Sequence, residues 1–179
     1  GGVCLNVGCI PSKALLHAAR VIEETREMRA HGIDFGEPKI DLAQLGAWKD
    51  KVVNQLTEGL SGLAKKRKVQ VITGTGRFES SHELMVLNDH GEERVRFRQA
   101  IIAAGSQAMT LPGLPEDPRI FDSTGALALG NIPPRLLVIG GGIIGLEMAT
   151  VYLAMGSEIS IVEMAPQLMP GTDTDLVKP

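Results

Sequence analysis

Apolar residues recur at helical spacing along the N-terminal part of the chain. From 12 to 28 the residues that share one helix face are Leu15, Ala18, Ala19 and Ile22. A second helix is predicted to start at Asp41, with Gln44 placed three residues later as a capping-box partner. Its apolar stripe, expected to be core packing, comprises Leu42, Leu45, Trp48, Val52, Leu56, Leu60 and Leu63.

The middle of the chain alternates between apolar and polar positions, which is the period of a β-strand. The segments 83–87 and 94–98 flank a turn sequence at 88–91 and together predict a hairpin. Two further apolar runs, 69–73 and 99–104, predict strands, the second of them buried. The proline-rich stretch 111–118 predicts a crossover and a domain boundary.

Near the C-terminal end, an apolar run over 136–139 leads directly into a glycine-rich sequence. Helical and then β-rich patterns follow over 143–154 and 158–162. A Gly-x-Gly-x-x-Gly motif that follows a strand, opens a helix and has an acidic residue 18 positions beyond its last glycine predicts a dinucleotide-binding βαβ unit. The alternative is a structural βαβ unit that binds no ligand.

The chemistry of this motif suits a pyrophosphate. Glycines let backbone N–H groups approach the phosphates at the helix N-terminus, and Glu163 would accept hydrogen bonds from ribose hydroxyls. Its charge would repel a 2′-phosphate, and no arginine follows it, so we predict NAD rather than NADP. The predicted NAD residues are Gly140, Gly141, Gly142, Ile143, Ile144, Gly145 and Glu163.

The chain has only two cysteines, Cys4 and Cys9, and only four residues separate them. From the spacing alone, a redox-active pair and two inert thiols are equally good interpretations. The four histidines are scattered, so no metal site is predicted. A helix that begins near Pro11, together with Lys13 one turn beyond Cys9, would favour a thiolate at Cys9, and these neighbours favour the redox pair.

Composition limits the partners. The net charge of −3 gives no electrostatic case for nucleic acid or a membrane surface, and no apolar segment is long enough to span a bilayer. These properties predict a cytoplasmic protein. The 179 residues include no starting Met, and too little chain follows Gly140 to complete a Rossmann sheet, so we expect an internal fragment.

The opening sequence, Gly1-Gly2-Val3-Cys4-Leu5-Asn6-Val7-Gly8-Cys9-Ile10-Pro11-Ser12-Lys13, resembles the active-site segment of the flavin-dependent pyridine nucleotide–disulfide oxidoreductases. Within that family it looks most like the dihydrolipoamide dehydrogenase branch, the E3 component of 2-oxoacid dehydrogenase complexes. Glutathione reductases usually have Val-Pro-Lys-Lys where this chain has Ile-Pro-Ser-Lys. Mercuric reductases share Ser-Lys and are the nearest alternative, and a non-catalytic fragment is a further one.

The resemblance implies an α/β fold, part of a two-dinucleotide-domain (FAD/NAD) Rossmann-like flavoprotein disulfide reductase. Residues 1–112 would be part of the FAD-binding domain without its N-terminal βαβ unit, and 113–179 the first part of the NAD-binding domain. The rest of that domain and the C-terminal dimerisation domain, with its acid–base histidine, would be missing. The fragment alone is therefore expected to be inactive, whereas the parent would form a homodimer and act on lipoyl domains.

The resemblance also assigns roles in the oxidation of protein-bound dihydrolipoamide by NAD⁺ through FAD. Cys4 would exchange with substrate, Cys9 would lie against the flavin, and Lys13 would lie near flavin N5. Glu147 would pair with Lys13; the alternative is a carboxylate on a helix surface. The implied FAD residues are Gly1, Gly2, Cys4, Lys13, Gly76, Ala104, Gly105 and Ser106, where Ala104 replaces the Thr of the family's Ala-Thr-Gly-Ser.

Overall fold

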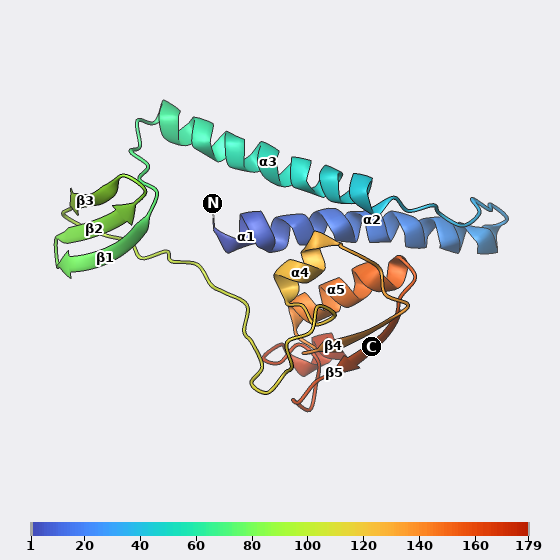
Figure 1. The fold of residues 1–179 in the computed structure, drawn as a ribbon. Helices are drawn as coiled ribbons and strands as arrows, with labels where there is room; N and C mark the ends of the chain where they lie inside the picture. Colours follow the sequence, from blue (N-terminus) through green and yellow to red (C-terminus); the bar gives the residue numbers. More distant parts are fainter. Residues whose placement is uncertain (1, 179) are drawn as a thin grey trace. The chain divides into compact units, whose positions relative to one another are not determined.

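The computed structural model describes residues 2–178 and has two compact units (Figure 1). One unit contains the residues up to Thr57 together with those from Ser106 onward, and the other contains 58–105. Each unit is described by itself below. The predicted division of the chain into an FAD-binding part and an NAD-binding part, at 112 and 113, stays a prediction.

The first unit opens with a short helix, α1 (Val3–Val7), followed by the long helix α2 (Cys9–Glu27) and a 3₁₀ turn, η1 (Met28–His31). The predicted helix is thus confirmed and begins earlier, at Cys9. Helix α3 (Leu42–Lys66) also begins as predicted. Asp41 accepts hydrogen bonds from the Gln44 backbone N–H at 3.0 Å and from its side-chain amide at 2.9 Å, so it caps the first turn.

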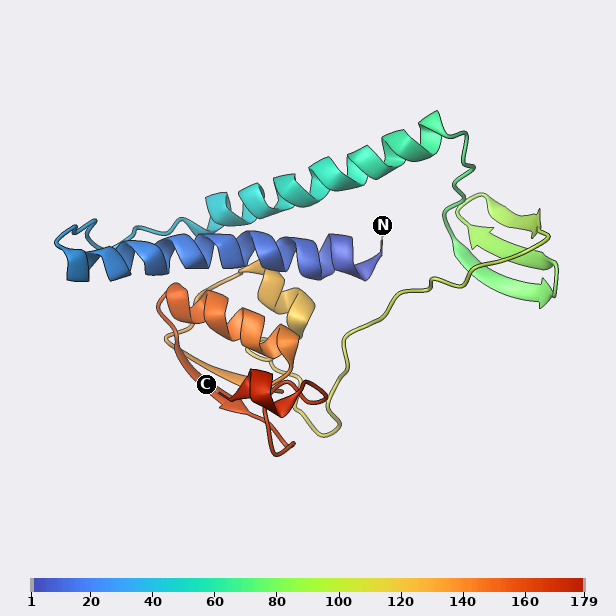
Figure 2. The same cartoon turned by 180° about the vertical axis from the view of Figure 1, so that it is seen from behind.

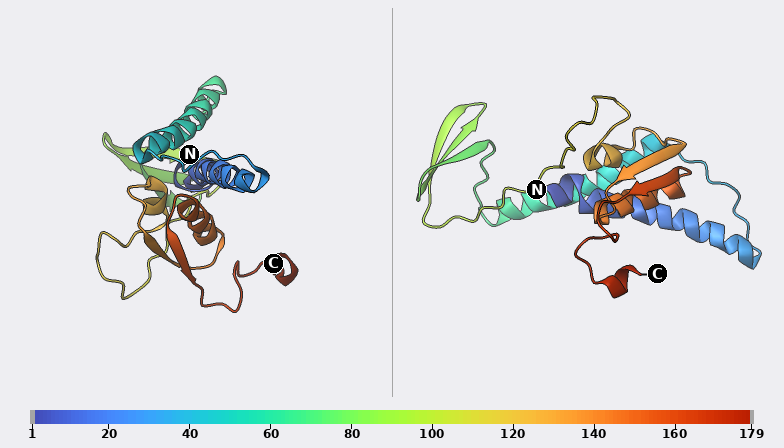
Figure 3. Two further views of the ribbon diagram at one scale, coloured as in Figure 1. Left: turned by 90° about the vertical axis from the view of Figure 1, so that its right-hand side faces the viewer. Right: turned by 90° about the horizontal axis from the view of Figure 1, so that it is seen from below.

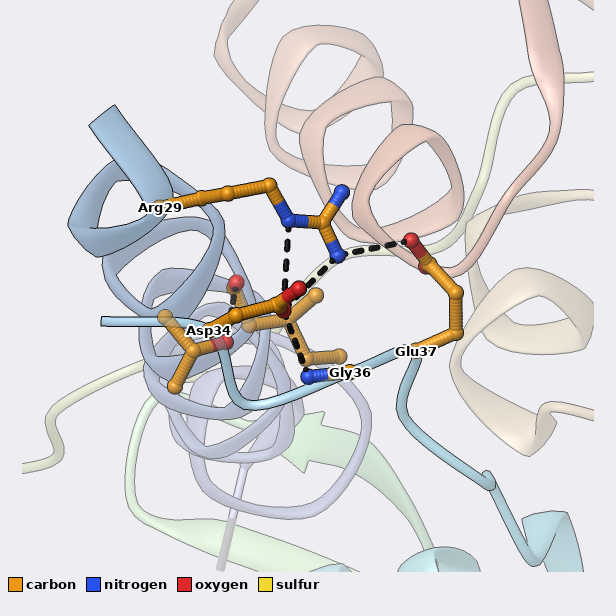
Figure 4. Close-up of polar contacts among 6 residues, drawn as sticks. Arg29, Asp34, Gly36 and Glu37 are labelled. Atoms are coloured by element: carbon orange, nitrogen blue, oxygen red, sulfur yellow. Dashed lines mark hydrogen bonds and ion pairs between the residues drawn. The ribbon is translucent and has the colours of Figure 1, made fainter. Parts of the chain in front are cut away.

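The turn between α2 and α3 is held by the polar cluster in Figure 4. One carboxylate oxygen of Asp34 accepts from the Gly36 N–H at 2.8 Å and from two Arg29 nitrogens at 3.2 Å, and Arg29 also reaches Glu37 at 3.3 Å. The Gly36 N–H and then Arg29 hold the pKa of Asp34 below its usual value. Because these side chains are exposed, the ion pairs shape the turn more than they stabilise the fold.

The predicted βαβ unit is present as β4 (Arg135–Ile139), α5 (Ile143–Ala154) and β5 (Glu158–Val162). The two strands pair in parallel, with Leu136 opposite Ile159, and Figure 3 shows them side by side. Two short helices, α4 (Ser123–Ala128) and α6 (Thr174–Val177), lie outside the predicted elements. Asp122 and Asp173 cap them by accepting backbone N–H bonds, and this capping chemistry is the signal that pattern analysis overlooked.

The core of this unit lies between α2 and α5. The apolar residues that share it come from α2, α4, α5 and their neighbours: Leu15, Ala19, Ala126, Leu127, Leu129, Met148, Val151, Tyr152, Ala154 and Met155. Leu136 and Ile159 of the strands pack against the same cluster from the other side. Helix α5 is apolar around most of its circumference because it is covered on both faces, by α2 and by the sheet (Figure 2).

The second unit is built around a three-stranded antiparallel sheet, β1 (Thr75–Ser80), β2 (Glu83–Asn88) and β3 (Gly91–Arg96). The predicted hairpin is confirmed in β2 and β3, with Asn88 opposite Gly91 across the turn. Strand β1 lies outside the strands predicted from the sequence pattern. It pairs with β2, and Phe78 meets Phe97 edge to face, with ring centroids 5.9 Å apart.

Two predicted strands are wrong for the residues described. The segments 69–73 and 99–104 have no strand structure, and Val71, Ile101 and Ile102 are 71%, 95% and 76% exposed. An apolar run becomes a strand only where a neighbouring strand accepts its backbone hydrogen bonds, and no described strand pairs with either run.

The expected packing of the α3 stripe is correct only at its start. Leu42 and Leu45 pack against the core cluster, whereas Trp48, Leu56, Leu60 and Leu63 are 39–52% exposed. The buried positions of α3 are Lys49 and Val53. The Lys49 ammonium is satisfied there because it donates to the carbonyl of Leu127 at 2.8 Å.

Candidate functional site

Cys4 and Cys9 are free and exposed thiols that lie on opposite sides of Gly8, on α1 and α2. The neighbouring Cys4 thiol, and after it partial desolvation, raise the pKa of the Cys9 thiol above its usual value. Lys13 acts in the opposite direction, as expected from its position, but is the weaker influence. In the dithiol form the neighbouring thiol thus acts against the thiolate that the sequence favours at Cys9, and that preference stays a prediction.

Lys13 and Glu147 form an ion pair between α2 and α5, 134 residues apart in sequence. The Lys13 ammonium lies 2.5 Å from one carboxylate oxygen of Glu147, whose side chain is only 16% exposed. The alternative of a carboxylate on a helix surface is therefore wrong. The pairing expected from the family resemblance is present, while its role in catalysis stays a prediction.

The second oxygen of Glu147 accepts a hydrogen bond from the hydroxyl of Ser12 at 2.5 Å. Ser12 is buried and was not among the residues predicted for this site. Nothing in the local sequence marks this contact, because it depends on how α2 packs on α5. Burial alone would raise the pKa of Glu147, but the bonds from Lys13 and Ser12 hold that pKa below its usual value.

The glycine-rich loop between β4 and α5 requires its first and last glycines. Gly140 has a φ of 110°, which L-residues rarely adopt, and a side chain at Gly145 would lie 2.1 Å from the carbonyl oxygen of Gly140. Gly142 caps α5 without a side-chain hydrogen bond, and nothing lies within 4 Å of where its Cβ would be. No side chain caps the N-terminus of α5, which leaves its first N–H groups available to a pyrophosphate.

Glu163, at the end of β5, lies against this loop. Its two oxygens accept backbone N–H bonds from Ala165 and Gly141, each at 2.7 Å. These bonds, the one from Ala165 first, hold the pKa of Glu163 below its usual value. The loop is also held from its other side, because the Met169 N–H donates to the Gly141 carbonyl at 2.8 Å. The residues after Glu163 were not among those predicted for this site.

The residues assigned to FAD are divided between the two units. Gly2, Cys4, Lys13 and Ser106 belong to the first unit, and Gly76, Ala104 and Gly105 to the second. Gly1 lies outside the described residues. Gly105 has a φ of 76°, so its turn suits glycine, and a side chain on Gly76 would press on Leu84 at 3.3 Å. Their assignment to FAD stays a prediction.

Residues 2–178 contain neither a cluster of metal ligands nor a membrane-spanning helix. No group of three or more His, Cys, Asp and Glu side chains there is placed to hold a metal ion. None of the described helices combines the length and the apolar character that crossing a membrane would demand.

The paired thiols and the glycine-loop βαβ unit together define a class of protein. The chain belongs to the pyridine nucleotide-disulphide oxidoreductase family, whose model matches residues 1–178.

Particular members of the family are close in sequence and in structure. The chain is 58% identical to the dihydrolipoyl dehydrogenase of Vibrio cholerae and 56% identical to that of Haemophilus influenzae. Each match covers 99% of this chain. It spans 38% and 37% of those relatives. Among solved structures it resembles a Cu(II) complex of the HOCl-induced flavoprotein disulfide reductase RclA from Escherichia coli, with a TM-score of 0.79 and 32% identity over 99% of this chain and 37% of that one.

Proposed function

We propose that this chain supplies the redox-active cysteines and the start of the NAD site of a dihydrolipoyl dehydrogenase, which oxidises protein-bound dihydrolipoamide and reduces NAD⁺. The observation that carries the proposal is the pair of exposed cysteines on either side of the helix break at Gly8, together with Lys13, which is ion-paired to the glycine-motif helix. A disulfide relay and a dinucleotide loop are thereby linked through one packed unit. The similarity to dihydrolipoyl dehydrogenases over nearly the whole chain supports the choice of substrate.

The first step is thiol–disulfide exchange at Cys4. One thiolate of dihydrolipoamide attacks the Cys4 sulfur of the Cys4–Cys9 disulfide, and Cys9 leaves as a thiolate. The second thiol of the substrate then loses its proton and attacks the mixed disulfide, so that lipoamide is released with its S–S bond and Cys4 is left reduced. Two electrons have then passed from substrate to the cysteine pair. We assign the exchange to Cys4 because the family resemblance places Cys9 against the flavin.

FAD, when bound, would carry these two electrons from the cysteine pair to NAD⁺. The residues present suit it in one respect that the structure supports: Cys4 and Cys9 are exposed, so a flavin ring has access to the thiols. Lys13 would provide a positive charge beside the thiols, and the ion pair with Glu147 would hold the Lys13 ammonium in position. Gly1, Gly2, Gly76, Ala104, Gly105 and Ser106 complete the proposed FAD contacts.

NAD⁺ would bind at the loop between β4 and α5. The N–H groups at the N-terminus of α5, which no side chain caps, would hold the pyrophosphate, and the absence of side chains at Gly140, Gly142 and Gly145 lets it approach. Glu163 would accept the adenosine ribose hydroxyls, and its negative charge would disfavour the 2′-phosphate of NADP⁺. Lipoyl domains as partners, a homodimer and a cytoplasmic location are part of the same proposal.

The test is anaerobic oxidation of dihydrolipoamide by the flavin-loaded full-length protein that contains this chain, with NADH followed by its absorbance. We expect NADH to appear with the wild type and to be lost in Cys4→Ser and Cys9→Ser. A matched control is Gln55→Ala, at an exposed position of α3, which should leave the rate unchanged. NADH formation that survives both cysteine substitutions would contradict the relay. A wild type that ignores dihydrolipoamide but reduces another disulfide would contradict the substrate.

A further inference from the structure

A single residue, Gly8, interrupts what would otherwise be one continuous helix. Helix α1 ends at Val7 and α2 begins at Cys9. Gly8 has φ −139° and ψ −118°, far from the helical values of about −63° and −42°. Its carbonyl nevertheless accepts the first hydrogen bond of α2, from the Ser12 N–H at 3.1 Å, so the break is confined to this one position.

The break decides whether the two cysteines can join. In an uninterrupted α-helix, residues five positions apart are turned by about 140° and their Cα atoms are separated by about 8.7 Å. Cysteines whose Cα atoms are more than about 7 Å apart cannot form a disulfide without moving the backbone. With the break at Gly8, α1 and α2 are not one continuous helix, so this fixed separation does not apply to the two cysteines.

A side chain at position 8 would also press on the backbone of α1 at Cys4. A Cβ there would lie 3.0 Å from the Cα of Cys4 and 3.0 Å from the carbonyl oxygen of Val3. Both are backbone atoms of α1, so relief requires a shift of the segment that holds the Cys4 thiol. A side chain at position 8 would therefore oppose the present backbone at Gly8 in two ways, through its preference for a continuous helix and through its steric contact with α1.

We propose that Gly8 is a positioning residue that sets the equilibrium between the dithiol and the disulfide of Cys4 and Cys9. Alanine favours a continuous helix, in which the two thiols would be too far apart to join, so it opposes the disulfide. Since alanine is preferred over glycine inside a helix by about fivefold, we expect Gly8→Ala to lower the disulfide-to-dithiol ratio by about fivefold or more. This inference rests on the proposed function, in which the pair cycles between the two states.

The experiment equilibrates the flavin-loaded protein without oxygen in buffers of defined glutathione to glutathione disulfide ratio. Forming the Cys4–Cys9 bond releases two electrons and two protons, which convert one glutathione disulfide into two glutathione molecules. After an acid quench, free thiols are counted with a maleimide that adds mass. The control is Gly46→Ala, which makes the same change within α3 where a Cβ would meet nothing within 4 Å.

A fivefold or larger shift toward the dithiol in Gly8→Ala, with Gly46→Ala unchanged, supports the proposal. Gly8→Ser, which is a poorer helix former, should shift the ratio in the same direction by less, and it replaces the alanine variant if that one fails to fold. A ratio within twofold of wild type in the folded variant overturns the role of Gly8. A wild type that forms no disulfide at any glutathione ratio overturns the relay itself, so the two failures are distinguishable.

Discussion

Glu147 shows how one carboxylate can serve two helices. One oxygen pairs with Lys13 and the other accepts from Ser12, so the side chain joins α2 to α5 by two bonds from adjacent residues. Replacing it by glutamine keeps an oxygen for Ser12 but removes the charge that faces Lys13. Because the carboxylate is largely buried, we expect Glu147→Gln to lower the free energy of unfolding by about 1–3 kcal/mol.

Urea unfolding measures this effect, and α2 itself provides a control. Glu24 makes an ion pair with Arg20 in which the side chains are 55% and 77% exposed. Glu24→Gln should therefore change the free energy of unfolding by less than about 0.5 kcal/mol. Equal changes in the free energy of unfolding for the two variants would mean that the link between α2 and α5 stabilises the fold no more than an exposed ion pair does.

Glu163 is the residue at which cofactor choice is decided if the proposed NAD site is correct. Its carboxylate lies at the end of β5 and holds the Gly141 N–H, so it is fixed before any ligand arrives. We expect Glu163→Gln to weaken NAD⁺ binding by about tenfold, the usual cost of losing a charged hydrogen-bond acceptor, and to narrow the preference over NADP⁺. Calorimetric titration with each nucleotide measures both quantities. Glu158→Gln, at the exposed start of the same strand, should change neither.

At the scale of elements, the packing of α2 on α5 supports both parts of the candidate site. Leu15 of α2 is fully buried in the cluster that contains Val151 and Tyr152. We expect Leu15→Ala to lower the free energy of unfolding by about 2–5 kcal/mol, because the cavity cannot close fully. The control Leu153→Ala, on α5 but 56% exposed, should cost less than about 0.5 kcal/mol. Urea unfolding of both variants measures the difference.

The same scale shows what the sequence alone can predict. Helix α5 and strand β5 begin and end where the pattern places them, since glycines and polar residues mark their ends locally. The runs 69–73 and 99–104 were predicted as strands from apolar character, but a strand needs a partner that a local pattern cannot supply. The Ser12–Glu147 bond was missed for a related reason: it spans 135 residues and exists only because two helices pack.

For the molecule as a whole, the carboxylates predict how stability depends on pH. The pKa values of Asp34, Asp41, Asp117, Glu147 and Glu163 are all lower in the folded chain than their ordinary values of 3.8 for Asp and 4.5 for Glu. A group whose folded pKa is lowered contributes stability that is present above its unfolded pKa and is lost as the pH falls through the folded pKa. We therefore expect the urea midpoint to be steady between about pH 5 and 8 and to fall below about pH 4. In Glu147→Gln the urea midpoint should fall less steeply at low pH, because one of these carboxylates is gone. A midpoint that instead drops between pH 5 and 7 would show that other groups control the loss of stability in acid.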